Sequence, residues 1–257
     1  MGVSVDMGRE VDYSWLHDDV EEGLVGAEWH QHAIRTLSTS LTTLAEVRGW
    51  PWHVGDQVTL AAWKPNNEAW RPAPDILIYP RLGPTERQEI DVRAEGPPAF
   101  IVEVASASTW AYDMSMEREG GRPRRRRVGK ARAYLVGLRV PEYLVFDPRS
   151  EFLAGQVRAW RRVGDAGDMV EEWLPEPDGR YQSRALGISL RPNGPLLRVL
   201  DPDGRPVPYW FEATRENAAL RQENAARRRE NAAQAQRIAA LEAEVDRLGR
   251  LSDQETS

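Results

Sequence analysis

The segment from Ala99 to Ser106 constrains the fold most, because it places a carboxylate inside an apolar strand. Its residues, Ala-Phe-Ile-Val-Glu-Val-Ala-Ser, follow the breaker Gly-Pro-Pro, and their apolar, β-branched character predicts a short buried strand. Side chains alternate along a strand, so Glu103 shares a face with Ile101 and Ala105. A buried carboxylate is costly unless a cation or hydrogen-bond donors meet it. Glu103 is therefore either paired with an arginine or the backbone, or a metal ligand, and the strand alone leaves both open.

A second carboxylate stands at the beginning of another predicted strand. Residues 75–79, Asp-Ile-Leu-Ile-Tyr, form an apolar run between Pro74 and Pro80. Proline cannot donate a ladder hydrogen bond, so Pro74 marks the start of the strand and Asp75 lies at that end. An aspartate at a strand end is also typical of a simple turn. We expect the strands of an α/β or α+β core to bring Asp75 and Glu103 together.

Two helices and several further strands complete the predicted core; the strands beyond Val54–Trp63 are Glu142–Asp147 and shorter ones over about Phe152–Arg161, Asp168–Leu174 and Gly187–Leu190. Apolar residues three and four apart between Glu28 and Val47 form one helical stripe. A second helix is predicted over Val128–Leu138, with Lys130 and Tyr134 one turn apart on one face. Residues Val54–Trp63 alternate and are predicted as one strand. The four histidines are interpreted as structural, since no pair has the spacing of metal ligands on a helix face.

Residues after Trp210 repeat every seven positions, beginning with Arg-Glu-Asn-Ala-Ala-Leu-Arg, and predict a coiled coil. Taking Ile238 as an a position places these residues at the core: Asn217, Asn224, Asn231 and Val245 at a, and Leu220, Leu241 and Leu248 at d. Asparagine at a fixes the register and favours dimers at a cost in stability. We expect a homodimer through residues 212–250, with a solitary solvated helix as the alternative.

Composition restricts the remaining classes of protein. The 257 residues include no cysteine, which excludes disulfides and thiolate metal sites and makes the cytoplasm the expected compartment. No run of about 18 apolar residues is present, so no membrane span is expected. The net charge is −6, so any contact with nucleic acid must be local. The local candidates are four consecutive arginines, which would equally suit an exposed loop: Arg124, Arg125, Arg126 and Arg127.

Several of these segments together resemble the Uma-two family of putative restriction endonucleases, within the PD-(D/E)xK nuclease superfamily. The resemblance covers most of residues 25–250 and rests on an ordered set of motifs. They are Pro74-Asp75, the strand Phe100–Ser106, Ser108-Thr109 with Tyr112-Asp113, Lys130 with Tyr134, and Pro141-Glu-Tyr-Leu-Val-Phe-Asp-Pro148. The segments around Leu186 and Leu200, and the heptad tail, are similar to downstream parts of the family.

The resemblance implies a restriction-endonuclease-like core, a mixed sheet flanked by helices, that cuts DNA with Mg²⁺ or Mn²⁺. It implies that Asp75 and Glu103 are metal ligands, that Lys130 is the catalytic lysine and that Glu28 completes the site. Ala105 occupies the position where the superfamily usually has its lysine, and residues 117–127 form an insertion. The expected organisation is an arm over residues 1–24, a nuclease domain over 25–210 and a coiled-coil tail over 211–257.

Two classes of function remain open from the sequence. One is a metal-dependent endonuclease acting on DNA, which the presence of Asp75, Glu103 and Lys130 favours. The other is a catalytically inactive DNA-binding or scaffold protein that assembles through its coiled coil, which the acidic net charge favours. Convergence of the three side chains on one point would distinguish them. A Ser-His-Asp hydrolase is disfavoured because no histidine follows His53.

Overall fold

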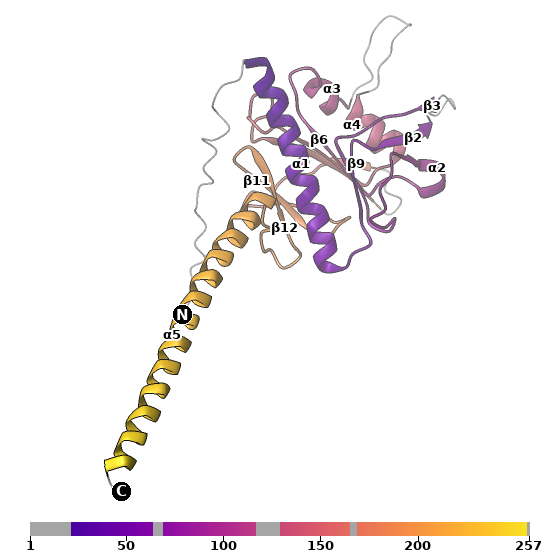
Figure 1. Cartoon of the computed structure of the whole chain (residues 1–257). Coiled ribbons are helices and arrows are strands. Elements are labelled where there is room, and N and C mark those ends of the chain that lie inside the picture. Colours follow the sequence, from indigo (N-terminus) through magenta and orange to yellow (C-terminus); the bar gives the residue numbers. More distant parts are fainter. Residues whose placement is uncertain (1–21, 64–68, 117–128, 165–168, 256–257) are drawn as a thin grey trace, which may run out of the picture. The chain divides into compact units, whose positions relative to one another are not determined.

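The computed structural model describes residues 22–63, 69–116, 129–164 and 169–255 (Figure 1). For residues 22–27, 63, 69, 240 and 242–255 it describes the backbone alone. The chain divides into two compact units, Met1–Val207 and Pro208–Ser257. The arginine run and most of the predicted N-terminal arm lie outside the described residues.

The first unit opens with one long helix, α1 (Glu22–Arg48). The residues of its apolar stripe, such as Ile34 and Leu41, are buried, and α1 packs against strands of the unit including β1 and β12. The helix ends at Gly49, whose φ of 65° is the left-handed conformation that suits glycine at a helix terminus. The predicted helix is confirmed, and it begins six residues before Glu28.

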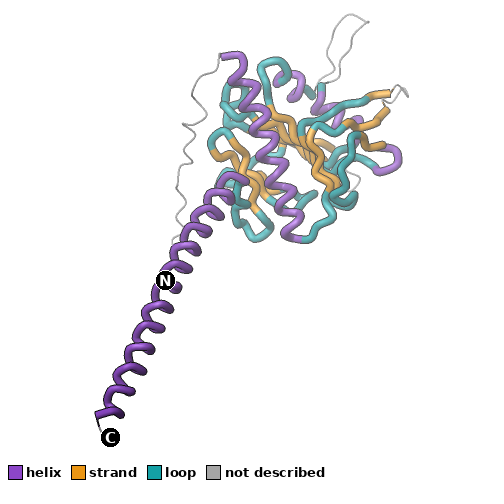
Figure 2. Tube along the Cα trace, in the orientation of Figure 1, coloured by secondary structure: helices purple, strands orange, loops and turns teal. Residues whose placement is uncertain are grey.

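A six-stranded mixed sheet forms the centre of this unit (Figure 2). Its order is β1-β4-β6-β7-β8-β9, and only the β6–β7 pair is parallel. The strands are β1 (His53–Asp56), β4 (Ile76–Tyr79), β6 (Phe100–Val104), β7 (Glu142–Phe146), β8 (Val157–Val163) and β9 (Met169–Glu172). Every residue of β4, β6 and β7 is buried, as their continuous apolar sequences predict. The α+β class with a restriction-endonuclease-like mixed sheet is therefore confirmed.

Two three-stranded sheets flank the central one. They are formed by β2 (Thr59–Trp63), β3 (Ala69–Trp70) and β5 (Glu89–Asp91), and by β10 (Tyr181–Gln182), β11 (Ser189–Asn193) and β12 (Leu196–Leu200). The short helix α2 (Val92–Glu95) follows β5. The single strand predicted over Val54–Trp63 is wrong. Gln57 has a φ of 54° and divides that segment between β1 and β2, which belong to different sheets.

The connection from β6 to the parallel strand β7 is helical, as a crossover between parallel strands usually is. It contains α3 (Trp110–Met114), α4 (Lys130–Arg132) and a π-helix over Ala133–Leu138. A side chain at Gly129 would collide with the carbonyl oxygen of Ser115, so glycine permits the close approach of α4 to the end of α3. This approach sets Lys130 beside the residues of α3.

The second unit consists mainly of α5 (Trp210–Glu255). Near its start, the backbone N–H of Tyr209 donates to the Glu212 carboxylate at 2.8 Å. Large apolar side chains of α5 are exposed, among them Leu220 and Ile238. In the part of the chain that the structure describes, neither α5 nor any other helix combines the length and apolar character of a membrane span.

Candidate active site

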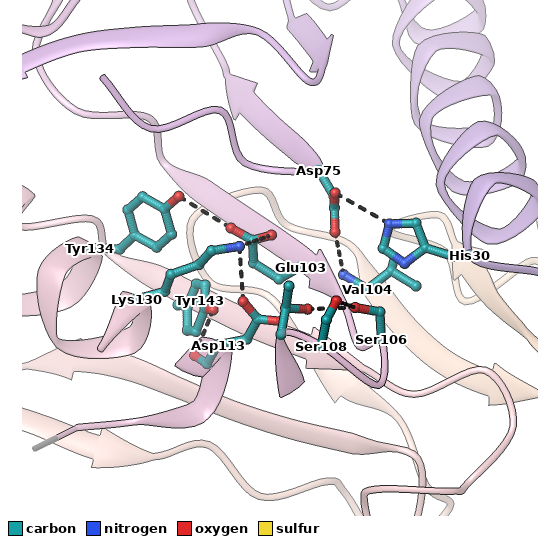
Figure 3. A network of polar contacts seen from close by, with 11 residues as sticks. His30, Asp75, Glu103, Val104, Ser106, Ser108, Asp113, Lys130, Tyr134 and Tyr143 are labelled. Carbon is teal, nitrogen blue, oxygen red and sulfur yellow. Dashed lines mark hydrogen bonds and ion pairs between the residues drawn. The ribbon is translucent and has the colours of Figure 1, made fainter. Parts of the chain in front are cut away.

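Glu103 lies in the core with its carboxylate held by two side chains (Figure 3). The residue is 1% exposed, and its strand neighbours on the same face, Ile101 and Ala105, belong to the apolar core. Lys130 Nζ lies 3.0 Å from Glu103 Oε2, and the Tyr134 hydroxyl donates to Oε1 at 3.1 Å. The buried carboxylate therefore has a cation and a hydrogen-bond donor, supplied by two residues one turn apart.

Lys130 bridges two buried carboxylates. Besides Glu103, its Nζ lies 2.8 Å from Oδ1 of Asp113, which is 1% exposed in α3. The Tyr143 hydroxyl donates to the backbone carbonyl of Asp113 and holds this turn in place. Oδ2 of Asp113 has no hydrogen-bond partner among the described residues.

Asp75 directly precedes β4, the strand beside β6, and lies near Glu103, Asp113 and Lys130; these four residues, with Tyr134 and His30, form the cluster. In the antiparallel β4–β6 register, Ile76 pairs with Val102, and one further step would set Asp75 opposite Glu103. Asp75 Oδ2 accepts from the backbone N–H of Val104 at 2.8 Å. Its Oδ1 lies 3.6 Å from Nε2 of His30, a residue of α1. Cross-strand neighbours on one face lie close together, so the expected approach of Asp75 and Glu103 has a structural basis.

Burial and the neighbouring charges control protonation in this cluster. Burial raises the pKa of Glu103 to about 8; the charge of Lys130 opposes the rise, and Asp75 and Asp113 add to it. Burial alone would lower the pKa of Lys130, but Glu103 and Asp113 together raise it, so the ammonium stays charged. A hydrogen bond to Asp75 raises the pKa of His30, against the effect of burial.

Sequence reasoning missed two members of the cluster and named one described residue, Glu28, that makes none of its contacts. Asp113 was visible as part of the Tyr112-Asp113 motif, whereas no sequence pattern set His30 apart from the other histidines. Glu28 is exposed on α1, and none of the contacts of the cluster involves it. Residues Arg124–Arg127 fall in a segment that is not described.

The chemistry of the cluster suits a hard divalent cation. Asp75 and Glu103 offer carboxylate oxygens, and Asp113 has a buried oxygen without a hydrogen bond. Across the described ranges, no three or more histidine, cysteine, aspartate or glutamate side chains form a group that could hold a metal ion. Mg²⁺ is commonly held by only one or two carboxylates and keeps several waters. Asp75 and Glu103 are therefore ligands of the right type, and enough of them, to hold Mg²⁺.

Residues 5–179 match the sequence profile of Uma2, described as a putative restriction endonuclease. The match covers more than half of the chain and includes every residue of the cluster. The chain belongs to the Uma2 family. The Uma2 match ends before β10 and does not reach α5. A comparison with curated proteins finds no match. Membership of Uma2 connects the cluster around Lys130 with a family of nuclease type.

Proposed function

We propose that this protein is a Mg²⁺- or Mn²⁺-dependent endonuclease that hydrolyses phosphodiester bonds of DNA. The observation that carries the proposal is the contact between Lys130 and the buried Glu103, close to Asp75, which directly precedes the neighbouring strand β4. Two acidic side chains and one lysine around a common point are what metal-assisted phosphodiester hydrolysis requires. Membership of Uma2 supports the same reaction.

Each residue of the cluster has a distinct part in the proposed reaction. Asp75 and Glu103 would hold the metal ion, which neutralises charge on the phosphate and lowers the pKa of a water molecule when bound. Lys130 presents a permanent positive charge that orients the attacking water and stabilises the additional negative charge of the transition state. The water oxygen forms a bond to phosphorus as the bond to the leaving oxygen breaks, and that oxygen takes up a proton.

Neighbouring groups fix these three side chains. The Tyr134 hydroxyl orients the Glu103 carboxylate, and the N–H of Val104 orients Asp75. Asp113 holds the ammonium of Lys130 from the other side at 2.8 Å. Side chains fixed in this way need little rearrangement when substrate binds, which is an advantage for transition-state stabilisation.

The alternative is a protein that keeps this fold, binds DNA or other partners and does not cut. The ion pairs of Lys130 with Glu103 and Asp113 favour this alternative, because a lysine can replace a metal as the counter-ion of buried acids. The proposed assembly is the same in both cases: a parallel homodimer through residues 212–250. The exposed Leu220, Ile238 and Leu241 of α5 support this assembly. The expectation of a cytoplasmic setting rests on the cysteine-free sequence alone.

Cleavage of supercoiled plasmid DNA with Mg²⁺ or Mn²⁺ tests the proposal. Asp75→Asn removes the charge and retains an oxygen that can accept from Val104, so we expect a folded and inactive variant. Asp91→Asn is the matched control, because Asp91 also accepts a backbone N–H, from Arg93, far from any proposed role. Nicking that is equal in wild type and Asp75→Asn, or no nicking by wild type with either metal, would contradict the proposal.

A further inference from the structure

A pocket of about 380 Å³ lies beside the cluster, at the edge of the sheet where the parallel strands β6 and β7 end. Its walls are residues 29–31 of α1, residues 105–108 after β6 and residues of the 147–152 loop after β7. His30 is common to the pocket and the cluster, since it lines the pocket and lies 3.6 Å from Asp75. Ligands of open α/β sheets commonly bind at the carboxyl ends of such strands.

Hydroxyl groups line the part of the pocket next to the cluster (Figure 3). The Ser106 hydroxyl lies 3.2 Å from that of Ser108 and 2.9 Å from that of Thr109. Three hydroxyls carry three protons and two contacts use two of them, so one proton remains to be donated to a ligand. Within the described residues, the backbone N–H groups of Ala107 and Ser108 have no hydrogen-bond acceptor. This loop therefore offers donors to an oxygen-rich ligand.

The opposite wall supplies a positive charge. Arg149 borders the pocket, and its only described ion pair is with Glu151, 2.9 Å away, where both side chains are more than two-fifths exposed. Such an exposed pair contributes little, so the guanidinium can turn to a ligand at small cost. Asp147 also borders the pocket, but its carboxylate accepts backbone N–H bonds from Arg149, Phe152 and Leu153. Asp147 is thus occupied within its own loop, and Glu151, the other acidic residue of the lining, is paired with Arg149.

We propose that this pocket binds the DNA backbone phosphate adjacent to the phosphodiester that is cut at Asp75, Glu103 and Lys130. The proposal rests on the proposed function and adds a binding site to it. Hydroxyls, backbone N–H groups and an arginine are the donors that commonly contact phosphate oxygens in protein–DNA complexes. Phosphate contacts fix the position of a strand without reading its sequence. The pocket would therefore set the neighbouring phosphodiester over the cluster.

Binding of a fluorescein-labelled, mixed-sequence DNA duplex in EDTA tests this proposal separately from cleavage. The slope of log affinity against log salt falls by about 0.9 for each phosphate that the protein no longer neutralises. Arg149→Ala should weaken binding several-fold and flatten the slope by about that amount. Ser108→Ala, which removes an uncharged donor, should weaken binding with the slope unchanged. Arg158→Ala is the matched control, since Arg158 is also an exposed arginine paired with a glutamate, Glu172, and should bind as wild type does.

The outcomes separate the pocket from the nuclease. An Arg149→Ala slope equal to that of wild type would overturn the pocket proposal, even if Asp75→Asn abolishes plasmid cleavage. If the slope is flattened in Arg149→Ala but wild type leaves plasmid uncut, Arg149 contacts a phosphate and the nuclease proposal is overturned. Wild-type protein that binds no duplex at any salt concentration would overturn both proposals.

Discussion

Lys130 is the residue whose surroundings are most unusual in this protein. The chain has 34 lysines and arginines, and only Lys64 and Lys130 are lysine. Lys130 lies between two buried carboxylates, and Lys64 is outside the described residues. A lysine is a compact point charge with three donors, whereas arginine is a planar fork, so the two are not equivalent at a phosphate.

We expect Lys130→Ala to bind metal and DNA but to lose turnover. The residue is not a proposed ligand, and the loss of one electrostatic donor typically costs about 10²- to 10³-fold in rate. Single-turnover cleavage of plasmid with saturating Mg²⁺ measures the effect. Lys130→Arg, which keeps the charge with a different shape, should recover only part of the rate. Wild-type rates in Lys130→Ala would remove this lysine from the mechanism.

The raised pKa of Glu103 predicts a pH-dependent stability in metal-free protein. The folded-state pKa is about 8 against 4.5 for the free group, so the folded state binds more protons between these values. The free energy of unfolding should therefore fall as pH rises from about 5 to 8, by an amount on the order of a few kcal/mol. Glu103→Gln cannot titrate and should show a smaller fall. Urea unfolding in EDTA at several pH values measures it, and parallel curves for the two proteins would contradict the shift.

Sequence reasoning found the residues of the cluster that stand in regular elements. Glu103 was identified because a charge interrupts an apolar strand, and the pairing of Lys130 with Tyr134 because helical spacing places them together. Asp113 and His30 were not identified, since their roles depend on contacts between distant segments. Asp113 meets Lys130 across an insertion, and His30 meets Asp75 across the packing of α1 on the sheet.

Among the elements, the buried strands were predictable from their continuous apolar runs, and α1 was predictable because its apolar residues recur three and four apart. The helix after Gly129 was predicted as well, but after Arg132 it continues as a π-helix over Ala133–Leu138. The Arg162 guanidinium donates to the carbonyl of Leu135 at 2.5 Å, and the Val140 N–H reaches back to the Tyr134 carbonyl. Arg162, a side chain from β8, thus occupies a carbonyl that the helix backbone would otherwise use as an acceptor. No local sequence pattern predicts this contact.

The arginine run Arg124–Arg127 lies in the same crossover and stays a prediction, because the structure does not describe it. Four positive charges in a chain of net charge −6 are a local candidate for DNA phosphate contact. Changing all four to glutamine should reduce the salt slope of duplex binding by about one unit for each phosphate that is no longer bound. The same change at two arginines of α5 that lie outside the predicted seam, Arg215 and Arg229, provides a comparison. No change in slope would mean that the run is simply an exposed loop.

For the whole molecule, the proposed homodimer depends on α5. Residues 212–250 lie in α5, and those apolar positions of the predicted seam whose side chains are described, Leu220, Ile238 and Leu241, are exposed. Asn217, Asn224 and Asn231 can each meet their own copy only in a parallel, aligned dimer. A dimer would bring two clusters to one duplex, and each could cut one strand.

We expect the full chain to sediment as a dimer at tens of micromolar and a chain ending at Trp210 to sediment as a monomer. The affinity should be modest, because three of the five a positions are asparagine. Changing Asn224 to leucine should strengthen association and relax its register. Monomers in both full-length and truncated protein would exclude α5 as the dimerisation element, and a dimeric truncated chain would assign assembly to the first unit.

Calorimetric titration with Mn²⁺ tests most directly whether the buried Glu103 is a metal ligand. Glu103→Gln keeps the shape of the side chain and one oxygen that can accept from Lys130, while its NH2 can donate to the Tyr134 hydroxyl oxygen, so the fold should be retained while the ligand charge is lost. We predict that wild type binds Mn²⁺ saturably. We predict that Glu103→Gln loses both Mn²⁺ binding and plasmid cleavage. Equal Mn²⁺ affinity in the two proteins would contradict a metal site at Glu103.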